Sequence, residues 1–181
     1  MAHEVIISGF GGQGVMSLGQ LLTYAGMLEG KNVSWLPSYG PEMRGGTANC
    51  SVIITDELVG SPIVTEATAV IAMNLPSLEK FEKTILAEGL LIINSSLVDS
   101  KTTRDDIDVI YIPANEIADE LGNNRVANMV MLGAYLEKTR VVSPDSIIES
   151  LREVLGHSKE HLVPVNQEAL KRGAQLVKNK G

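Results

Sequence analysis

The sequence predicts an α/β fold: a three-layer Rossmann-like domain with a mostly parallel sheet, helices on both faces and a C-terminal helical cap. Three observations lead to this prediction. A glycine-rich turn follows a short apolar run near the N-terminus. Two later apolar runs, 69–73 and 90–93, are continuous, which is typical of central strands covered on both faces. After residue 113 the periodicity is helical only.

The first half of the chain alternates between strands and helices. We expect a strand over 5–8, the glycine turn, and then a helix over 15–29 that Gly30 ends. A second strand follows over 32–36. In the third, 48–55, apolar and polar residues alternate, which indicates a strand exposed on one face.

The remaining strands are expected at 69–73, 90–93 and 109–112, with a helix near 77–87 between the first two. Ser143 and Pro144 are typical of a helix N-cap and first helical position. The C-terminal helices are expected at 114–121, 127–138, 144–155 and 166–178. No linker or repeat interrupts the chain, so residues 1–181 are expected to form one domain.

Charge and composition exclude several classes of function. The net charge is −7 without a basic block, and aromatic residues make up 4%, which argues against nucleic acid as a partner. The longest apolar runs are too short to span a membrane. The chain opens directly into a strand without a signal-peptide pattern, so we expect a cytoplasmic protein.

The chain has one cysteine, Cys50, so it cannot form an intrachain disulfide or supply a cysteine-ligated cluster or zinc site alone. We interpret Cys50 as a small core residue. His157 and His161 are four residues apart, but we place them in a surface loop rather than at a metal. Met129 and Met131 are expected in a helix core.

The glycine turn carries the strongest functional signal. Gly9, Gly11 and Gly14 fit the G-x-G-x-x-G spacing, which aims backbone N–H groups and the positive end of a helix dipole at an anion. Alternatively, the glycines only allow the helix to pack closely on the sheet. Gln13 favours the first reading, because its amide can reach a ligand or the backbone of a partner.

A dinucleotide site needs an acidic residue at the end of the second strand to hold the ribose hydroxyls. Here that strand ends at 35–38 without an acid, and Glu42 lies several residues further on, inside a polar glycine-rich loop. A stand-alone NAD-type enzyme therefore remains only an alternative.

The two loops together carry a family resemblance. Gly9–Gly14, with the sequence GFGGQG, and Pro37–Gly46, with the sequence PSYGPEMRGG, resemble the gamma subunit of the 2-oxoacid:ferredoxin oxidoreductases. The stretches 72–74 and 123–129 fit the same family, so the similarity covers nearly the whole chain. It is closest to the branch that acts on 2-oxoglutarate or branched-chain 2-oxoacids.

The resemblance implies a subunit that is inactive alone and carries no catalytic residue or metal ligand. Enzymes of this family oxidatively decarboxylate a 2-oxoacid to an acyl-CoA and pass the electrons to ferredoxin. It also implies that thiamine diphosphate, Mg²⁺ and iron–sulfur clusters belong to partner alpha, beta and ferredoxin-like delta subunits. This chain would bind none of these cofactors alone. An exposed docking face would also allow the isolated subunit to dimerise.

We expect the two loops to face coenzyme A or a partner loop. In this hypothesis the N–H groups of residues 11–14 and the Arg44 guanidinium meet a CoA phosphate. A purely structural docking role is the alternative. The turn at 123–125 is either a helix cap or a partner contact, and we leave both open. The candidate binding residues are Gly9, Gly11, Gly12, Gln13, Gly14, Ser38, Tyr39, Arg44, Gly45 and Gly46.

Overall fold

The computed structural model describes residues 2–38 and 47–179, so the predictions for Tyr39, Arg44, Gly45 and Gly46 lie outside the described residues. Within the described part the strands form a six-stranded sheet in the order β2-β3-β1-β4-β5-β6. The strands are β1 (His3–Gly9), β2 (Asn32–Ser38), β3 (Ala48–Thr55), β4 (Ala67–Ala72), β5 (Ile85–Asn94) and β6 (Asp108–Ile112).

Strands β1, β4, β5 and β6 run parallel, which confirms the mostly parallel sheet. β3 is the exception, because it lies antiparallel between β1 and β2. Its first residue, Ala48, pairs with Gly9 at the end of β1, and Asn49 pairs with Ser38 at the end of β2. The carboxyl ends of the parallel strands and of β2 therefore meet the start of β3 at one edge, here called the carboxyl edge.

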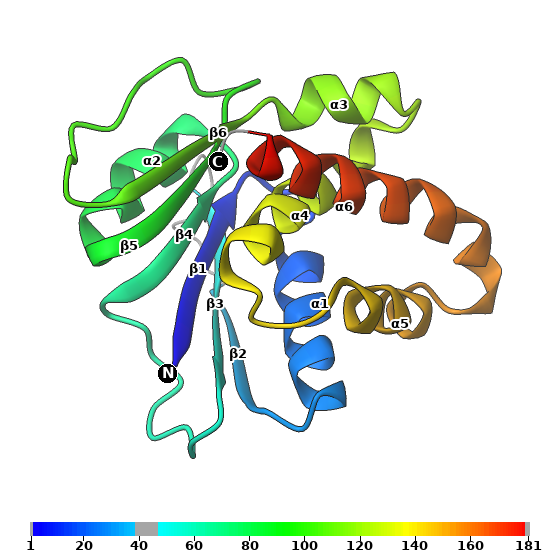
Figure 1. Cartoon of the computed structure of the whole chain (residues 1–181), viewed down its shortest axis with the longest axis horizontal. Coiled ribbons are helices and arrows are strands. Elements are labelled where there is room, and N and C mark those ends of the chain that lie inside the picture. The colour runs from blue at the N-terminus through cyan, green and yellow to red at the C-terminus, as the bar shows by residue number, and fades with distance from the viewer. Residues whose placement is uncertain (1, 39–46, 180–181) are drawn as a thin grey trace.

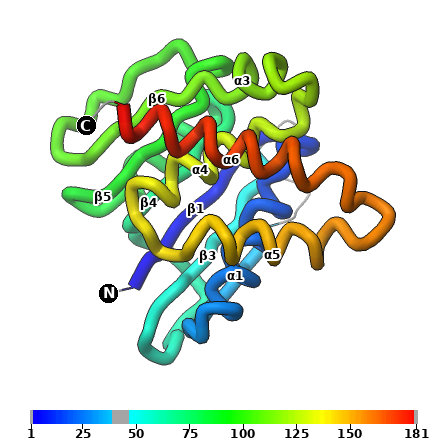
Figure 2. Tube along the Cα trace, turned by 45° about the vertical axis from the view of Figure 1, so that its right-hand side comes forward, coloured from blue at the N-terminus to red at the C-terminus, as the bar shows by residue number. Residues whose placement is uncertain are grey.

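The helices form two layers around this sheet. In Figure 1, α2 lies on one face, and α1, α4 and α6 lie on the other. Figure 2 shows α6 running across α4, and α5 beside α1. The helices are α1 (Val15–Leu28), α2 (Leu75–Phe81), α3 (Ala114–Glu120), α4 (Ala127–Thr139), α5 (Pro144–Leu155) and α6 (Val163–Lys178). The three-layer prediction with a helical C-terminal part is confirmed.

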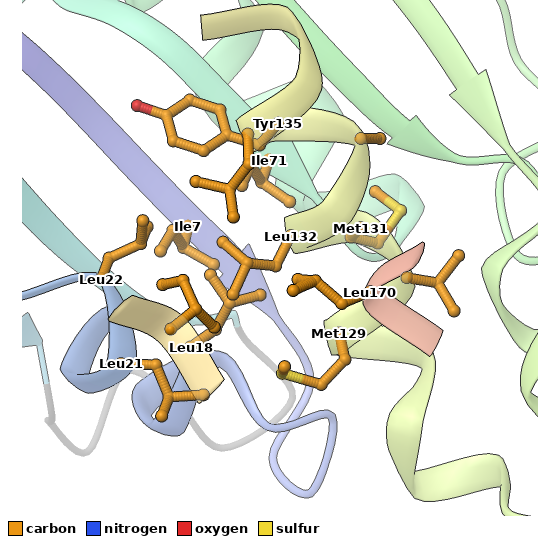
Figure 3. Packing of buried hydrophobic residues seen from close by; sticks show 14 of the residues in the cluster. Ile7, Leu18, Leu21, Leu22, Ile71, Met129, Met131, Leu132, Tyr135 and Leu170 are labelled. Carbon is orange, nitrogen blue, oxygen red and sulfur yellow. The ribbon is translucent and has the colours of Figure 1, made fainter. Parts of the chain in front are cut away.

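The larger part of the core lies between the sheet and the layer of α1, α4 and α6. In Figure 3, Ile7 and Ile71 of the sheet face Leu18 and Leu22 of α1 and Leu132 of α4. Met129 and Met131 are buried in the same cluster, as predicted. A smaller cluster joins the other face of the sheet to α2.

Helices α4 and α6 cross at two glycines. A Cβ atom added at Gly133 would collide with the backbone carbonyl of Leu170 on α6. One added at Gly173 would collide with the backbone carbonyl of Val130 on α4. These two residues, here called the crossing glycines, are glycine because two backbones touch.

Several predicted helix ends are confirmed. Gly30 has a φ of +72°, and the N–H of Lys31 donates to the carbonyl of Gly26 across the end of α1, at 2.9 Å. The Ser143 hydroxyl accepts a hydrogen bond from the Ser146 N–H at 3.1 Å, which is the predicted cap of α5.

Two helix boundaries were predicted wrongly. The helix expected at 77–87 is the shorter α2, which begins after a cap at Asn74 and stops because β5 already starts at Ile85. The segment expected as a loop around His157 and His161 is a 3-10 helix, His157–Leu162, and it runs directly into α6. No helix among the described residues is long and apolar enough to cross a membrane.

Candidate functional site

The glycine turn joins β1 to α1 at the carboxyl edge, and we call residues 10–14 the glycine loop. The Gln13 N–H donates to the Phe10 carbonyl at 3.2 Å and closes the turn. Gly12 has a φ of +89° and Gly14 a φ of +75°, both in the left-handed region that favours glycine. Gly14 is also the N-cap of α1. The predicted strand, turn and helix are confirmed.

The glycines of the motif are not glycine for the same reason. A Cβ added at Gly9 would lie 2.6 Å from Oε1 of Gln13 and 2.8 Å from Cβ of Met73, so close packing within the chain requires Gly9. A Cβ at Gly14 would collide with the side chain of Asn128. Gly11 has neither constraint, because its φ is not left-handed and nothing described lies within 4 Å of an added Cβ.

The glycine loop has backbone N–H groups without an acceptor in the part of the chain that the structure describes. Among the described residues, no acceptor binds the N–H groups of Gly11, Gly12 or Gly14. The first turn of α1 contains no acidic residue, and the helix is 14 residues long. The free N–H groups and the positive end of the dipole therefore favour a negatively charged group here.

The Gln13 side chain is engaged within the chain. Its Oε1 accepts hydrogen bonds from the Phe10 N–H at 2.6 Å and from Nδ2 of Asn74 at 3.4 Å. Its Nε2 donates to the Met73 carbonyl at 3.4 Å. The amide thus ties the glycine loop to the end of β4. Direct contact of Gln13 with a ligand stays a prediction.

Buried asparagines extend this contact across the carboxyl edge. Asn94 at the end of β5 is fully buried, and its Nδ2 donates to the Met73 carbonyl at 3.2 Å and to Oδ1 of Asn115 at 2.8 Å. Its Oδ1 accepts from the Ala114 N–H at the start of α3, at 3.3 Å. Asn94 was not among the residues predicted for the site. The usable signal was an asparagine directly after each of two continuous apolar strands, at 74 and 94.

The second predicted loop begins and ends at the same edge. Ser38 is exposed at the end of β2, and Thr47 lies just before β3. Because β3 alone separates β2 from β1, the ends of β1 and β2 lie about two strand spacings, roughly 10 Å, apart. The structure therefore brings Ser38 and the predicted residues of the glycine loop to one edge.

Other residues singled out in the sequence lie in ordinary structural positions. Burial raises the pKa of the Cys50 thiol to about 12, which suits a core residue. Oδ1 of Asn123 accepts from the Arg125 N–H at 3.1 Å, so Asn123 is a helix cap, whereas the alternative of a partner contact stays a prediction. Within residues 2–38 and 47–179 no three His, Cys, Asp or Glu side chains gather as a metal site would need.

The outward face of α1 is uncharged, and the exposed side chains near its C-terminal end are apolar or aromatic. No residue of this helix is charged, although it lies at the surface. Tyr24, Met27 and Leu28 are exposed by 47%, 57% and 52%. Aligned side chains of this kind are typical of a surface that another protein covers.

A hollow of about 700 Å³ lies between α4, α5 and α6. Glu29, at the far end of α1 from the glycine loop, is one of the residues that line it. None of the predicted binding residues does so, and the candidate site remains at the carboxyl edge.

Comparison with known proteins gives a consistent picture. The family model described as pyruvate ferredoxin/flavodoxin oxidoreductase matches residues 4–176. Ketoisovalerate oxidoreductase subunit VorA of Methanothermobacter marburgensis is 38% identical over 174 residues, which cover 94% of this chain. The chain spans only 36% of the length of that relative.

Two relatives match over nearly their full length. 2-Oxoglutarate synthase subunit KorC of Methanocaldococcus jannaschii is 32% identical over 181 residues, covering 98% of this chain and 95% of that relative. The crystal structure of a keto/oxoacid ferredoxin oxidoreductase gamma subunit from Geobacter sulfurreducens superposes with a TM-score of 0.84 at 28% identity. That superposition covers 98% of this chain and 99% of the other.

Proposed function

This chain belongs to the pyruvate ferredoxin/flavodoxin oxidoreductase family, and on that premise we propose that it is the gamma subunit of a 2-oxoacid:ferredoxin oxidoreductase. The complex converts a 2-oxoacid and coenzyme A to an acyl-CoA and CO₂ and passes two electrons to ferredoxin. Its substrate is 2-oxoglutarate or a branched-chain 2-oxoacid, because the relatives named for 2-oxoglutarate and ketoisovalerate are 32% and 38% identical.

Within that complex the glycine loop receives a phosphate of coenzyme A. The observation that carries this proposal is Gly11, which is glycine for no reason found within the described chain. Its N–H and those of Gly12 and Gly14, at the positive end of α1, bind no acceptor among the described residues. The chain that carries Arg44 leaves the sheet at Ser38 and returns at Thr47, both at this edge.

The absence of an acid at the end of β2 fits coenzyme A better than NAD. In NAD sites a carboxylate at this position holds the two free ribose hydroxyls. The adenosine ribose of coenzyme A carries a 3′-phosphate, which a carboxylate would repel. β2 ends instead at the neutral Ser38.

The redox cofactors belong to partner subunits in this proposal. Thiamine diphosphate supplies the carbanion chemistry of the complex, and iron–sulfur clusters carry its electrons. The one cysteine of this chain is buried with a raised pKa, which does not fit a cluster ligand.

The uncharged outer face of α1 supports the assignment as a subunit. Permanent interfaces are depleted of charge and enriched in aromatic residues and methionine. Tyr24, Met27 and Leu28 offer such a surface to the catalytic subunits. The same face would allow the isolated chain to dimerise.

The first test is anoxic purification of the native protein with identification of every co-eluting chain by mass. The pool is assayed for CoA-dependent viologen reduction with pyruvate, 2-oxoglutarate and 2-oxoisovalerate. We expect thiamine-diphosphate and cluster-bearing partners and activity with 2-oxoglutarate or 2-oxoisovalerate. A lone chain that binds NAD would contradict the proposal.

The second test separates CoA binding from assembly. Arg44→Ala in the reconstituted complex should raise the KM for coenzyme A and leave subunit stoichiometry unchanged. Lys101→Ala, a change at an exposed lysine beyond β5, is the matched control for loss of one positive charge. If Arg44→Ala changes neither the KM nor assembly, Arg44 has no part in the site.

A further inference from the structure

We propose that Asn128, at the start of α4, is a positioning residue that holds the glycine loop in its binding conformation. The inference rests on the proposed function, because it concerns how that loop is oriented toward coenzyme A. Asn128 lies 114 residues from the loop in sequence, and no motif spacing links the two.

Asn128 contacts the residue at which the loop becomes a helix. Its Nδ2 donates to the Gly14 carbonyl at 3.2 Å, and its Oδ1 accepts from the Met129 N–H at 2.9 Å. The side chain is 8% exposed and fills the space beside Gly14 that a Cβ would need. Both ends of the amide are therefore used, and the contact fixes which way the Gly14 carbonyl points.

The orientation of that carbonyl determines the direction of a neighbouring N–H group. In a planar trans peptide the C=O of Gly14 and the N–H of Val15 point in opposite directions. The Gly14 carbonyl also accepts the first hydrogen bond of α1, from the Leu18 N–H at 3.0 Å. Holding it toward the helices therefore aims the Val15 N–H outward, in the direction of the open N–H groups of the loop.

This arrangement differs from an ordinary helix cap. Most helices begin at Ser, Thr, Asp or Asn, whose side chain bonds the first turn. Gly14 has no side chain, and α1 has no side-chain cap of its own. Asn128 instead donates a hydrogen bond to the Gly14 carbonyl from outside the helix, and it does not bond the N–H groups of the first turn. The N–H groups are thereby left free for a ligand.

The test compares Asn128→Leu, which keeps the shape and removes the hydrogen bonds, with Asn128→Ala. Asn179→Ala, at an exposed position at the end of α6, is the matched control for loss of an asparagine side chain. In the assembled complex we expect Asn128→Leu to raise the KM for coenzyme A by about tenfold, the value of one hydrogen bond. The KM for the 2-oxoacid should stay unchanged, and kcat should stay within about twofold, because the chemical step lies on other subunits.

A second readout does not depend on activity. Hydrogen exchange of the Leu18 amide in the isolated chain should speed up in both Asn128 variants, whereas amides in the middle of α6 should not change. If the KM for coenzyme A and the Leu18 exchange rate both match the wild type, Asn128 does not position the loop. The inference would also be overturned if both KM values rose while kcat and thermal stability fell, because that combination would show general unfolding.

Gly11→Glu distinguishes this inference from the proposed function. A carboxylate at Gly11 should repel a phosphate and raise the KM for coenzyme A. If Gly11→Glu leaves that KM unchanged, the glycine loop does not bind coenzyme A, and both the proposed phosphate site and the role of Asn128 fail. If Gly11→Glu raises it and Asn128→Leu does not, only the role of Asn128 is wrong.

Discussion

The crossing glycines and the glycine loop use the same residue type for opposite purposes. At Gly133 and Gly173 the space of the missing side chain is filled by the backbone of the facing helix. At Gly11 the corresponding space is empty within the described chain. Where the chain itself occupies the space of the missing side chain, close packing requires glycine. Open space alone does not mark a site, but Gly11 also lies in a loop at the start of α1 whose N–H groups bind no acceptor among the described residues.

The largest effect on stability is expected at the crossing glycines. Gly133→Ala would force α4 and α6 apart, because a methyl group would overlap the Leu170 carbonyl. We expect a loss of about 3 kcal/mol or more in the free energy of unfolding, at the upper end for overpacked cores. Urea denaturation of the isolated chain measures it.

Gly60→Ala is the control for this change, because nothing described lies within 4 Å of an added Cβ there. It should alter the free energy of unfolding by less than about 0.5 kcal/mol. Equal stabilities of Gly133→Ala and Gly60→Ala would show that the helices can separate freely.

Gly14→Ala should have the next largest effect. The alanine would have to adopt a φ of +75° and displace the Asn128 side chain. We expect a loss of about 2 kcal/mol, roughly half of it from the left-handed conformation. Thermal unfolding should show a midpoint lower by about 4–8 °C. An unchanged midpoint would mean that the loop is not held against α4.

A smaller effect is expected at the other end of α1. There Glu29 accepts hydrogen bonds from the Ser143 N–H at 2.6 Å and from the Ser146 hydroxyl at 2.7 Å. Partial burial opposes the charged form, but these hydrogen bonds outweigh it and lower the pKa of Glu29. Because Glu29 is exposed, Glu29→Gln should cost only about 0.5–1 kcal/mol at pH 7.

The difference in stability between wild type and Glu29→Gln should depend on pH. A pKa that is lower in the folded than in the unfolded state contributes stability above the unfolded value, which is about 4.3 for Glu. That contribution is lost as the pH falls through the folded pKa. Denaturation curves of wild type and Glu29→Gln should therefore differ at pH 7 and converge in acid. A constant difference would assign the effect to packing.

Gly11→Ala should have the smallest effect on stability and a clear effect on function. The methyl group points into open space, so the free energy of unfolding should change by less than about 0.5 kcal/mol. In the assembled complex the KM for coenzyme A should rise severalfold. If stability, assembly and the KM are all unchanged, the open space at Gly11 receives no ligand, and the contrast with the crossing glycines has no functional meaning.

Local signals in the sequence predicted most of the fold. Gly30, Ser143 and Pro144 end or begin helices for reasons contained in a few neighbouring residues, and the structure confirms them. The antiparallel insertion of β3 could not be predicted in this way, because strand order depends on pairings between distant segments.

The candidate site was only partly accessible to sequence reasoning. The spacing of Gly9, Gly11 and Gly14 indicated the turn, but not that Gly9 is needed for packing and Gly11 is not. The contacts of Asn94 and Asn128 join elements 20 or more residues apart, so no local pattern contains them. The family resemblance, in contrast, was predicted correctly from the two loops.

Both ends of α1 are completed by parts of the chain that are synthesised much later. Asn128 reaches Gly14 and Ser143 reaches Glu29, each across a separation of 114 residues. Since chains emerge from the ribosome N-terminus first at about 5–20 residues per second, α1 waits several seconds for its two distant contacts. The first helix to be synthesised therefore gains its stabilising contacts late. Contacts between residues so far apart in the sequence slow folding. A nascent chain arrested before residue 128 would contain the glycine loop but lack the contact from Asn128 that fixes the loop's conformation.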